Sequence, residues 1–384
     1  MITVSHIVGA RPQFIKYFPV FRAMERHNEK ADEAGRIQDV LIHTGQHYDY
    51  AMSKRFFDEF GLKEPDYHLN VGSASHGKQT GEILKKTEAV LRKVRPDVVM
   101  VYGDTNSTLG GALAAVKLHL PVAHVEAGLR SYNRRMPEEI NRIAADHVSS
   151  MLFCPGRAAV ENLKKEGFTN VLNEGNLVDG AEAEPGPGRP DDGRPVVVNS
   201  GDVMYDVFLH ARGLAAGKSR IVEKLGLTGR SFGLLTLHRA ENTDDLKQFL
   251  KRAGFVKHVF KEHPILFPAH PRIRKQAEAH MQAFGRHVTL IDPVGYFDLL
   301  RLLEACDFVL TDSGGLQKEA YWSRKQCVTL REETEWVETL ESEWNTLAGE
   351  FKGLWKPDQG EDTVYGHGRA AEGIVGFLFK YFNH

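Results

Sequence analysis

The feature that most constrains the fold is the alternation, along the whole chain, of short apolar runs rich in β-branched residues with longer amphipathic stretches. This alternation is typical of α/β units, in which helices connect parallel strands. In the first half we expect strands at Ile2–Val8, Asp39–His43, Val98–Tyr102, Val122–Val125 and Met151–Cys154. In the second half we expect them at Phe232–Leu237, Ile265–Pro268, Val288–Ile291, Phe308–Thr311 and Cys327–Leu330. The two series predict an α/β protein with two doubly wound parallel sheets.

The segments between these strands have the periodicity of amphipathic helices. The predicted helices are Pro12–Arg26, a segment near Tyr50–Phe60, Gly77–Val94, Thr108–Leu118, Pro137–Val148, Ala158–Glu166, Asp244–Lys261, Arg272–Phe284, Tyr296–Ala305, Gly315–Trp322 and Gly368–Tyr381. Residues 174–195 interrupt the pattern with a Gly-, Pro- and Asp-rich stretch, which predicts a disordered insertion or linker.

A length of 384 residues favours two domains. We assign residues 1–173 and 368–384 to an N-terminal domain and residues 196–367 to a C-terminal one, with 174–195 as linker. Ligands of such sheets bind beyond the carboxyl ends of the strands, so we expect the active site in a cleft between the domains.

Composition excludes several classes of function. Lys and Arg total 49 and Asp and Glu total 51, so a net charge of -2 provides no general attraction to nucleic acid or anionic membrane. No apolar run approaches the 18 residues or so of a membrane span, and the N-terminus has no signal-peptide pattern. Three widely spaced cysteines, Cys154, Cys306 and Cys327, offer no disulfide framework, so we expect a cytoplasmic protein.

Two strand-to-helix turns could bind phosphate. Ser313, Gly314 and Gly315 open a helix directly after a strand, which places a hydroxyl and backbone N–H groups at a helix N-terminus. Arg11 and Lys16 follow the first strand and could reach a diphosphate. The alternatives are an ordinary capped turn at the first place and a solvated basic turn at the second.

Carboxylates end two strands that we expect to share one sheet edge. Asp104 and Glu126 should therefore project into the same cleft. Glu138 follows in the first turn of a helix, and Arg142, four residues on, lies on the same helix face. Loop or cap carboxylates and a surface ion pair are the alternatives.

His238 and His270 end two strands of the second domain, although either could be an ordinary core or surface histidine. No histidine pair has zinc-ligand spacing, so no metal is expected.

Gly213–Ser219 resembles a P-loop but is one residue short and follows a helical stretch, so we interpret it as a loop. Gly186 and Gly188 lie in the linker, and no Gly-rich dinucleotide fingerprint follows a strand. No cofactor is therefore expected.

Together these motifs resemble the non-hydrolysing UDP-N-acetylglucosamine 2-epimerases over nearly the whole chain. The matching segments are Gly9–Lys16, His43–His47, Gly103–Asn106, His124–Arg130, Pro137–Arg142, Thr236–Arg239, Pro268–Pro271, Thr311–Gln317 with Glu319, and Leu330–Glu335. The resemblance implies a GT-B architecture of two Rossmann-like domains, a UDP-sugar as substrate and a homodimer.

By this resemblance Asp104, Glu126, Glu138 and His238 are the catalytic candidates. Arg11, Lys16, His238, Ser313 and Gly314 would hold the diphosphate, with Gly315 beside them and His270 near them. Glu319 would bind the ribose, Tyr296 would lie near the uracil, and Arg142 would orient Glu138.

The family interconverts UDP-GlcNAc and UDP-ManNAc at C2. No carbonyl adjoins C2 to stabilise a carbanion, and the fingerprint of a redox cofactor is absent from the sequence. Elimination of UDP to 2-acetamidoglucal, followed by re-addition, avoids both difficulties and requires two acid/base groups on opposite faces of C2.

The chain departs from this family pattern at two positions, where Tyr48 and Trp336 replace arginines. Both changes resemble the branch that acts on UDP-2,3-diacetamido-2,3-dideoxyglucuronate. A GT-B glycosyltransferase, an inactive UDP-sugar sensor or a hydrolytic relative could also carry many of these motifs.

Overall fold

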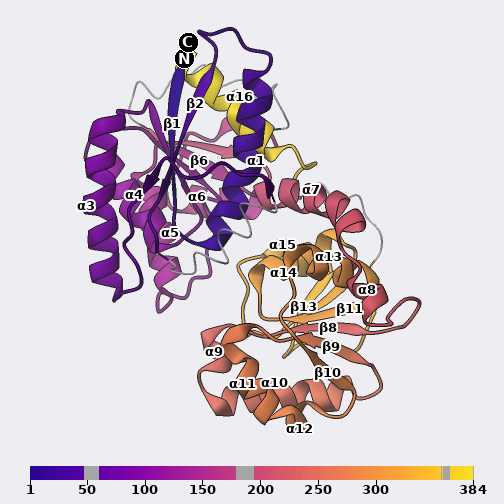
Figure 1. The fold of residues 1–384 in the computed structure, drawn as a ribbon. Helices are drawn as coiled ribbons and strands as arrows, with labels where there is room; N and C mark the ends of the chain where they lie inside the picture. Colours follow the sequence, from indigo (N-terminus) through magenta and orange to yellow (C-terminus); the bar gives the residue numbers. More distant parts are fainter. Residues whose placement is uncertain (47–59, 179–193, 356, 358–363, 384) are drawn as a thin grey trace. The chain divides into compact units, whose positions relative to one another are not determined.

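The computed structural model describes residues 1–46, 60–178, 194–355, 357 and 364–383 (Figure 1). The chain forms two compact units. Unit 1 comprises residues 1–207 and 362–384, and unit 2 comprises residues 208–361. Nearly all of the helix predicted near Tyr50–Phe60, and residues 179–193 of the predicted linker, lie outside the described residues. Within the described residues, no helix combines the length and apolar character needed to cross a membrane.

Unit 1 contains a seven-stranded parallel sheet in the order β3-β2-β1-β4-β5-β6-β7. Its strands are β1 (Ile2–Val8), β2 (Ile37–His43), β3 (Tyr67–His68), β4 (Val98–Tyr102), β5 (Val122–Val125), β6 (Met151–Cys154) and β7 (Val196–Asn199). Its helices are α1 (Arg11–Asn28), α3 (His76–Val94), α4 (Asn106–Val116), α5 (Pro137–Val148), α6 (Arg157–Lys165) and α16 (Ala370–Asn383), with a short 3-10 turn at Leu172–Gly175.

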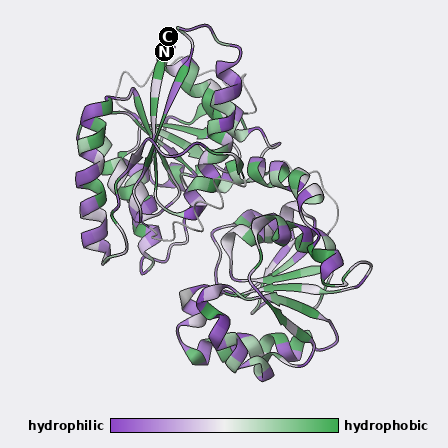
Figure 2. Ribbon diagram, viewed as in Figure 1, coloured by the Kyte–Doolittle hydropathy of each residue, from purple (hydrophilic) through white to green (hydrophobic). Residues whose placement is uncertain are grey.

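Helices cover both faces of this sheet, as the period of two along β1 shows. Ile7 faces α4, where it lies so close that a Cβ on Gly111 would be 2.8 Å from its Cδ1. The preceding residue, His6, points to the opposite face and meets Tyr17 of α1, with ring centroids 5.0 Å apart. Strands covered on both sides are mostly apolar, which explains the hydrophobic runs of the sequence (Figure 2).

Unit 2 contains a six-stranded parallel sheet in the order β10-β9-β8-β11-β12-β13. Its strands are β8 (Gly233–Thr236), β9 (Ile265–Pro268), β10 (Val288–Ile291), β11 (Phe308–Thr311), β12 (Gln326–Thr329) and β13 (Asn345–Leu347). The helices are α8 (Ile221–Lys224), α9 (Ala240–Thr243), α10 (Leu246–Val259), α11 (Arg274–Ala279), α12 (Met281–Phe284), α13 (Tyr296–Ala305), α14 (Gly314–Trp322) and α15 (Val337–Glu341), with a 3-10 turn at Pro271–Ile273.

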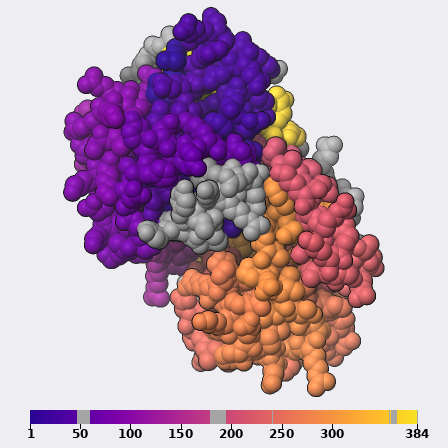
Figure 3. Space-filling view, viewed as in Figure 1, coloured from indigo at the N-terminus to yellow at the C-terminus, as the bar shows by residue number. Residues whose placement is uncertain are grey.

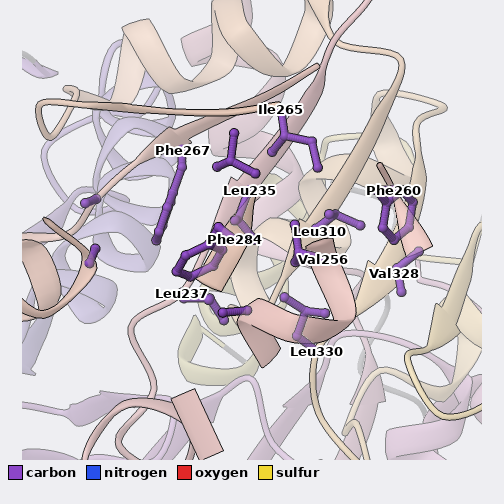
Figure 4. Close-up of a cluster of buried hydrophobic side chains, with 14 of the residues drawn as sticks. Leu235, Leu237, Val256, Phe260, Ile265, Phe267, Phe284, Leu310, Val328 and Leu330 are labelled. Atoms are coloured by element: carbon purple, nitrogen blue, oxygen red, sulfur yellow. The ribbon is translucent and has the colours of Figure 1, made fainter. Parts of the chain in front are cut away.

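Aromatic and aliphatic side chains fill the core of unit 2 beneath α10 and α12 (Figure 4). Phe249, Phe267 and Phe284 are fully buried there, and the rings of Phe249 and Phe284 meet edge to face at 5.5 Å. This packing keeps the carboxyl ends of β8 and β11 in fixed positions.

Both sheets reverse their strand order at one point, between β1 and β4 in unit 1 and between β8 and β11 in unit 2. Loops that leave the two central strands there run to opposite faces and open a crevice at the carboxyl ends, where α/β proteins bind ligands. The two topologies confirm the predicted doubly wound fold class.

α7 (Val203–Lys218) runs from unit 1 into unit 2 and begins beside the segment by which the chain returns. The Asp202 N–H donates to the Tyr365 carbonyl at 2.9 Å. Asp206 accepts hydrogen bonds from the N–H groups of Ala370 and Ala371 at 3.2 and 2.8 Å, so its carboxylate caps α16. α16 in turn packs on α1, and Figure 3 shows this last helix in yellow next to the indigo N-terminal part of unit 1.

Three of the differences between the structure and the sequence prediction concern the domain boundary, the segment Gly213–Ser219 and one helix. Val196–Val207, assigned above to the C-terminal domain, belong to unit 1 because β7 pairs with β6. Gly213–Lys218, interpreted as a loop, form the second half of α7, whose buried face includes Ala211 and Ala215. The single helix predicted at Arg272–Phe284 is broken at His280, whose ring Nδ1 lies 2.9 Å from the Gln276 carbonyl and competes with the backbone for it.

Candidate active site

Asp104 and Glu126 follow neighbouring parallel strands, β4 and β5, whose last residues Tyr102 and Val125 are paired. Glu126 has a positive φ of 71°, a backbone conformation that a non-glycine residue adopts only when its surroundings hold it there. Gly103, which leads from β4 to Asp104, has a positive φ of 59°, a conformation that favours glycine. The backbone thus aims both carboxylates from one sheet edge, as the sequence predicted.

Lys16, in the second turn of α1, is buried and pairs with Glu126, with Nζ 3.1 Å from Oε1. Burial disfavours the charged amine, but Glu126 and then Asp104 overcome this effect, and the pKa of Lys16 is raised. One lysine charge therefore acts on both carboxylates. Arg11, at the start of the same helix, is exposed.

Arg142 connects α5 to the end of β4. Its Nη2 donates to the Asp104 carboxylate, and its Nη1 donates to Glu139 Oε2 at 2.9 Å. The predicted pairing of Arg142 with Glu138 is wrong, because the guanidinium turns to buried Glu139 and to Asp104, whereas Glu138 is exposed on the first turn of α5. Asn141 adds a bond from its amide to the Asp104 carbonyl at 2.9 Å.

Glu139, which the sequence analysis did not select, fixes the loop between β5 and α5. Its Oε2 accepts from the Ser131 N–H and hydroxyl, both at 2.9 Å, and its Oε1 accepts from the Tyr132 N–H at 2.9 Å. The Pro-Glu-Glu motif already contains Glu139 as its second glutamate, but nothing in the sequence indicates which of the two glutamates is buried. Glu139 thus positions the loop and Arg142 together.

Gln13 joins the turn after β1 to the turn after β4. Its Oε1 accepts from the N–H groups of Gly9 and Ala10 at 2.8 and 3.1 Å, and its Nε2 donates to the Tyr102 carbonyl at 2.9 Å. Side chains that satisfy the amides of a helix start usually come from the N-cap residue, so this role was not evident from the sequence.

Beneath the site, buried His124 of β5 lies between two acceptors. Its Nε2 is 2.7 Å from the Gly103 carbonyl and its Nδ1 is 2.7 Å from Asp146 Oδ1. Arg130 donates to the other oxygen of Asp146 at 2.7 Å. Burial alone would raise the pKa of Asp146, but His124 and Arg130 lower it, so this carboxylate stays ionised and supports the turn that carries Asp104.

In unit 2, Asp312 organises the end of β8. This buried carboxylate accepts from the N–H groups of His238 and Arg239 at 3.0–3.1 Å and from the Asn242 amide at 3.2 Å. His238 Nδ1 lies 3.2 Å from Asp312 Oδ1. Burial opposes ionisation of Asp312, but these donors, His238 first, lower its pKa. The carboxylate therefore holds Nδ1–H and leaves Nε2 as the nitrogen that can exchange a proton with a ligand.

Ser313 caps α14, its Oγ accepting from the Leu316 N–H at 3.4 Å. Gly314 lies close to two side chains, since a Cβ there would be 2.9 Å from Glu335 Oε1 and 3.1 Å from Trp336 Nε1. Gly315 is half-buried beside it. Trp336, one of the two departures from the family pattern, carries a cation on its face, with Lys318 Nζ 3.6 Å from the ring centroid. Tyr48, the other departure, lies outside the described residues.

Glu319, on α14, accepts a hydrogen bond from the Tyr296 hydroxyl at 2.8 Å, and both residues are buried. Tyr296 therefore fixes one carboxylate oxygen, which orients the other. His270 is exposed, and its ring centroid lies 5.8 Å from that of His238. Among the described residues, no group of three or more His, Cys, Asp and Glu side chains could hold a metal ion.

The structure thus collects the candidates in two groups. Asp104, Glu126, Lys16 and Arg142 meet in unit 1, with Glu138 and Arg11 on the adjoining surface. His238, His270, Ser313, Gly314, Gly315, Glu319 and Tyr296 lie at the carboxyl edge of the unit 2 sheet, on the loops and helices that follow β8, β9, β10 and β11. Each group lies where its sheet reverses strand order, which is the expected place for ligand binding.

Comparison with known proteins gives one consistent result. The profile of the UDP-N-acetylglucosamine 2-epimerase family matches residues 29–378. A UDP-N-acetylglucosamine 2-epimerase homolog of Methanococcus maripaludis is 47% identical, over 90% of this chain and 88% of its own length. The UDP-2,3-diacetamido-2,3-dideoxy-D-glucuronate 2-epimerase of Pseudomonas aeruginosa is 42% identical, over 97% and 98%.

Solved structures agree. The crystal structure of Methanocaldococcus jannaschii UDP-GlcNAc 2-epimerase in complex with UDP-GlcNAc and UDP is similar with a TM-score of 0.77 and 37% identity, over 97% of this chain and 98% of that one. The Neisseria meningitidis UDP-GlcNAc 2-epimerase bound to UDP-GlcNAc is similar with a TM-score of 0.79 and 25% identity, over 99% and 100%.

Proposed function

Since this chain belongs to the UDP-N-acetylglucosamine 2-epimerase family, we propose that it inverts C2 of a UDP-linked 2-acetamido sugar by eliminating UDP and adding it back. The protein is an isomerase of the carbohydrate epimerase type, and the substrate is UDP-GlcNAc or its 2,3-diacetamido uronate analogue. It would supply a precursor of a cell-surface polysaccharide.

The observation that supports this function best is the pairing of two carboxylates with two cations at adjoining strand ends. Inversion by elimination needs one group that removes the C2 proton and a second that returns a proton to the opposite face. Asp104, held by Arg142, and Glu126, held by Lys16, provide fixed carboxylates on neighbouring strands. Glu138, exposed on the next helix, is a third group that can exchange protons with solvent.

Bond breaking at C1 leaves negative charge on the diphosphate of UDP. In unit 2, the Ser313 hydroxyl, the N–H groups that begin α14 and the Asp312-held His238 are suited to stabilise this charge. Lys16 and Arg11 would contribute from unit 1, and Glu319, oriented by Tyr296, would accept hydrogen bonds from the ribose hydroxyls. The electron pair of the broken C2–H bond forms the C1=C2 double bond of the glucal, and the electron pair of the C1–O bond leaves with UDP. No external electron acceptor is therefore required.

Incubation with UDP-GlcNAc or the uronate in D2O tests this reaction. An epimerase incorporates deuterium at C2 and produces the manno isomer, both of which NMR detects. A glycosyltransferase would leave C2 unlabelled, a hydrolytic relative would release free sugar, and a sensor would bind UDP without turnover. Absence of C2 exchange with both substrates would exclude the proposed function.

We also infer a cytoplasmic homodimer. Cys154, Cys306 and Cys327 are buried thiols, which suits a reducing compartment. Light scattering of the purified protein measures the mass of the assembly, and the mass of a single 43.1 kDa chain would contradict the dimer.

A further inference from the structure

We propose that Arg134 and Arg135 bind a carboxylate on the sugar, so that the preferred substrate is a UDP-linked 2-acetamido uronic acid and not the neutral UDP-GlcNAc. This inference rests on the proposed function and assigns the substrate class to the same site. Neither arginine was selected from the sequence.

The two arginines lie in a loop that is attached to the acid/base groups. Glu139 binds the loop's backbone at Ser131 and Tyr132 and, on its other side, receives Arg142, which holds Asp104. The loop closes with a bond from the Met136 N–H to the Asn133 carbonyl at 3.0 Å. Because α5 begins directly afterwards with Pro137 and Glu138, the two arginines immediately precede a candidate proton-transfer group.

The loop conformation is specified by its own residues. Tyr132 has a positive φ of 59°, and its hydroxyl donates to Asn162 Oδ1 at 2.7 Å. The Arg135 N–H donates to Asn133 Oδ1 at 3.2 Å. These bonds hold the backbone of the arginine pair, while both side chains are exposed and have no hydrogen bond or ion pair with any described residue.

The distribution of charge explains why additional cations are needed there. Within the described part of unit 1, Lys16 is paired with Glu126, and Arg142 is shared by Asp104 and Glu139. The charges of these cations are balanced by protein carboxylates, and Glu138 adds a further negative charge. A substrate with a carboxylate at C6 would be repelled by this acidic group unless it met further cations. Arg134 and Arg135 are two such cations at this loop.

Guanidinium groups match the chemistry of a sugar carboxylate. Arginine presents N–H donors in a planar fork that binds both carboxylate oxygens, and such charged hydrogen bonds are stronger than those to a neutral hydroxyl. A hydroxymethyl group at C6, as in UDP-GlcNAc, offers one hydroxyl and no charge. The arginine pair therefore discriminates between the two substrates by charge.

The test compares kcat/KM for UDP-2,3-diacetamido-2,3-dideoxyglucuronate and for UDP-GlcNAc in the wild type and in the double variant R134Q/R135Q. We expect the wild type to prefer the uronate and the variant to lose roughly 10- to 100-fold of kcat/KM on the uronate, the range for one or two charged hydrogen bonds, with little change on UDP-GlcNAc. R134K/R135K, which keeps the charge but not the fork, should recover part of the loss.

The control is R36Q, which makes the same Arg-to-Gln change once, at an exposed residue just before β2 and at the opposite end of the strands, and should leave both activities unchanged. Equal losses on both substrates in R134Q/R135Q would show that the arginines bind the shared diphosphate and would overturn the inference, as would a wild-type preference for UDP-GlcNAc. Both outcomes leave the epimerase function intact, whereas absence of C2 exchange with both substrates contradicts the function itself.

Discussion

At the scale of single residues, the candidate site depends on ion pairs between side chains of unit 1. Lys16 with Glu126 and Arg142 with Asp104 each place a cation against a buried or half-buried carboxylate. Such pairs contribute little net stability once desolvation is counted, so their presence at a sheet edge indicates function more than folding.

Replacing either carboxylate by its amide should stop catalysis while preserving the fold. For Asp104→Asn and Glu126→Gln we expect kcat to fall at least tenfold with little change in KM, because the amide keeps the shape but cannot accept the C2 proton. Steady-state kinetics of epimerisation measures both constants. A variant that retains more than about a tenth of wild-type kcat would remove that residue from the proton transfers.

Gly9 should be intolerant of any side chain. A Cβ there would lie 2.0 Å from Thr44 Oγ1 and 2.1 Å from Ser107 Oγ, two hydroxyls that are hydrogen-bonded to each other. Gly9→Ala should therefore lower the free energy of unfolding by about 1–3 kcal/mol or more, measured by chemical denaturation. Gly81→Ala, in α3 with no atom within 4 Å of the new Cβ, is the control and should stabilise the protein by up to about 1 kcal/mol. Equal effects would contradict the packing argument.

The sequence indicates which side chains lie at the carboxyl ends of the strands. It does not indicate the hydrogen-bond and ion-pair partners of those side chains. Strand ends in a parallel sheet share an edge, so Asp104 and Glu126 followed from spacing alone. The choice of Arg142 between Glu138 and Glu139 depends on which carboxylate the β5–α5 loop buries, and that is decided by contacts from Ser131 and Tyr132. Asp312 likewise acts through backbone amides of another strand end, which no local pattern reveals.

At the scale of elements, all ten predicted strands are present, because parallel strands buried on both faces are largely apolar. Three further strands, β3, β7 and β13, were not predicted: β3 and β13 have only two and three residues, and β7 directly follows the predicted linker. The Gly-rich half of α7 was misjudged because the helix is stabilised by burial of Phe208, Ala211 and Ala215, which outweighs the cost of glycine.

The cap on α16 makes stability depend on pH. Burial is the main cause that raises the pKa of Asp206, and the nearby charges of Asp202 and Glu372 raise it further. The hydrogen bonds from the Ala370 and Ala371 amides lower it, but the net result is a pKa of about 7. A carboxyl whose pKa is raised on folding stabilises the protein fully below its unfolded pKa of 3.8 and loses that contribution as pH rises through about 7.

Asp206→Asn cannot titrate and keeps an oxygen acceptor for one of the two amides, since in the wild type the Ala370 N–H bonds to Oδ1 and the Ala371 N–H to Oδ2. The free energy of unfolding, measured by chemical denaturation at each pH, should show the wild type losing stability relative to the variant between about pH 4 and pH 7. The total loss should be roughly 4 kcal/mol. A difference that stays constant over this range would mean that Asp206 does not change its pKa on folding. Asp206→Ala, which removes the cap, should be less stable than Asp206→Asn by about 1 kcal/mol.

At the scale of the whole molecule, the two units have the same kind of sheet and divide the proposed chemistry, with acid/base groups in unit 1 and nucleotide-binding groups in unit 2. The number of domains and their fold class followed from the sequence. The boundary did not, because β7 joins unit 1 by pairing with β6, a contact that lies beyond the predicted linker.

If one UDP is held by groups from both units, its addition should slow amide hydrogen exchange at two separate places. We expect protection at the start of α14, near Ser313, and at the turn that carries Arg11 and leads to Lys16, measured by mass spectrometry. Protection at α14 alone would show that the diphosphate is held without Arg11 and Lys16.

The return of the chain to unit 1 through α16 also sets an order of events during synthesis. Residues 208–361 of unit 2 leave the ribosome before α16 exists, and so can bury their own core first. The sheet face of unit 1 that α16 covers, including Phe153 against Phe377, remains open until α16 itself is translated. A nascent chain of this protein therefore exposes unit 1, incomplete and apolar, for longer than unit 2, and chaperones would be expected to act on unit 1.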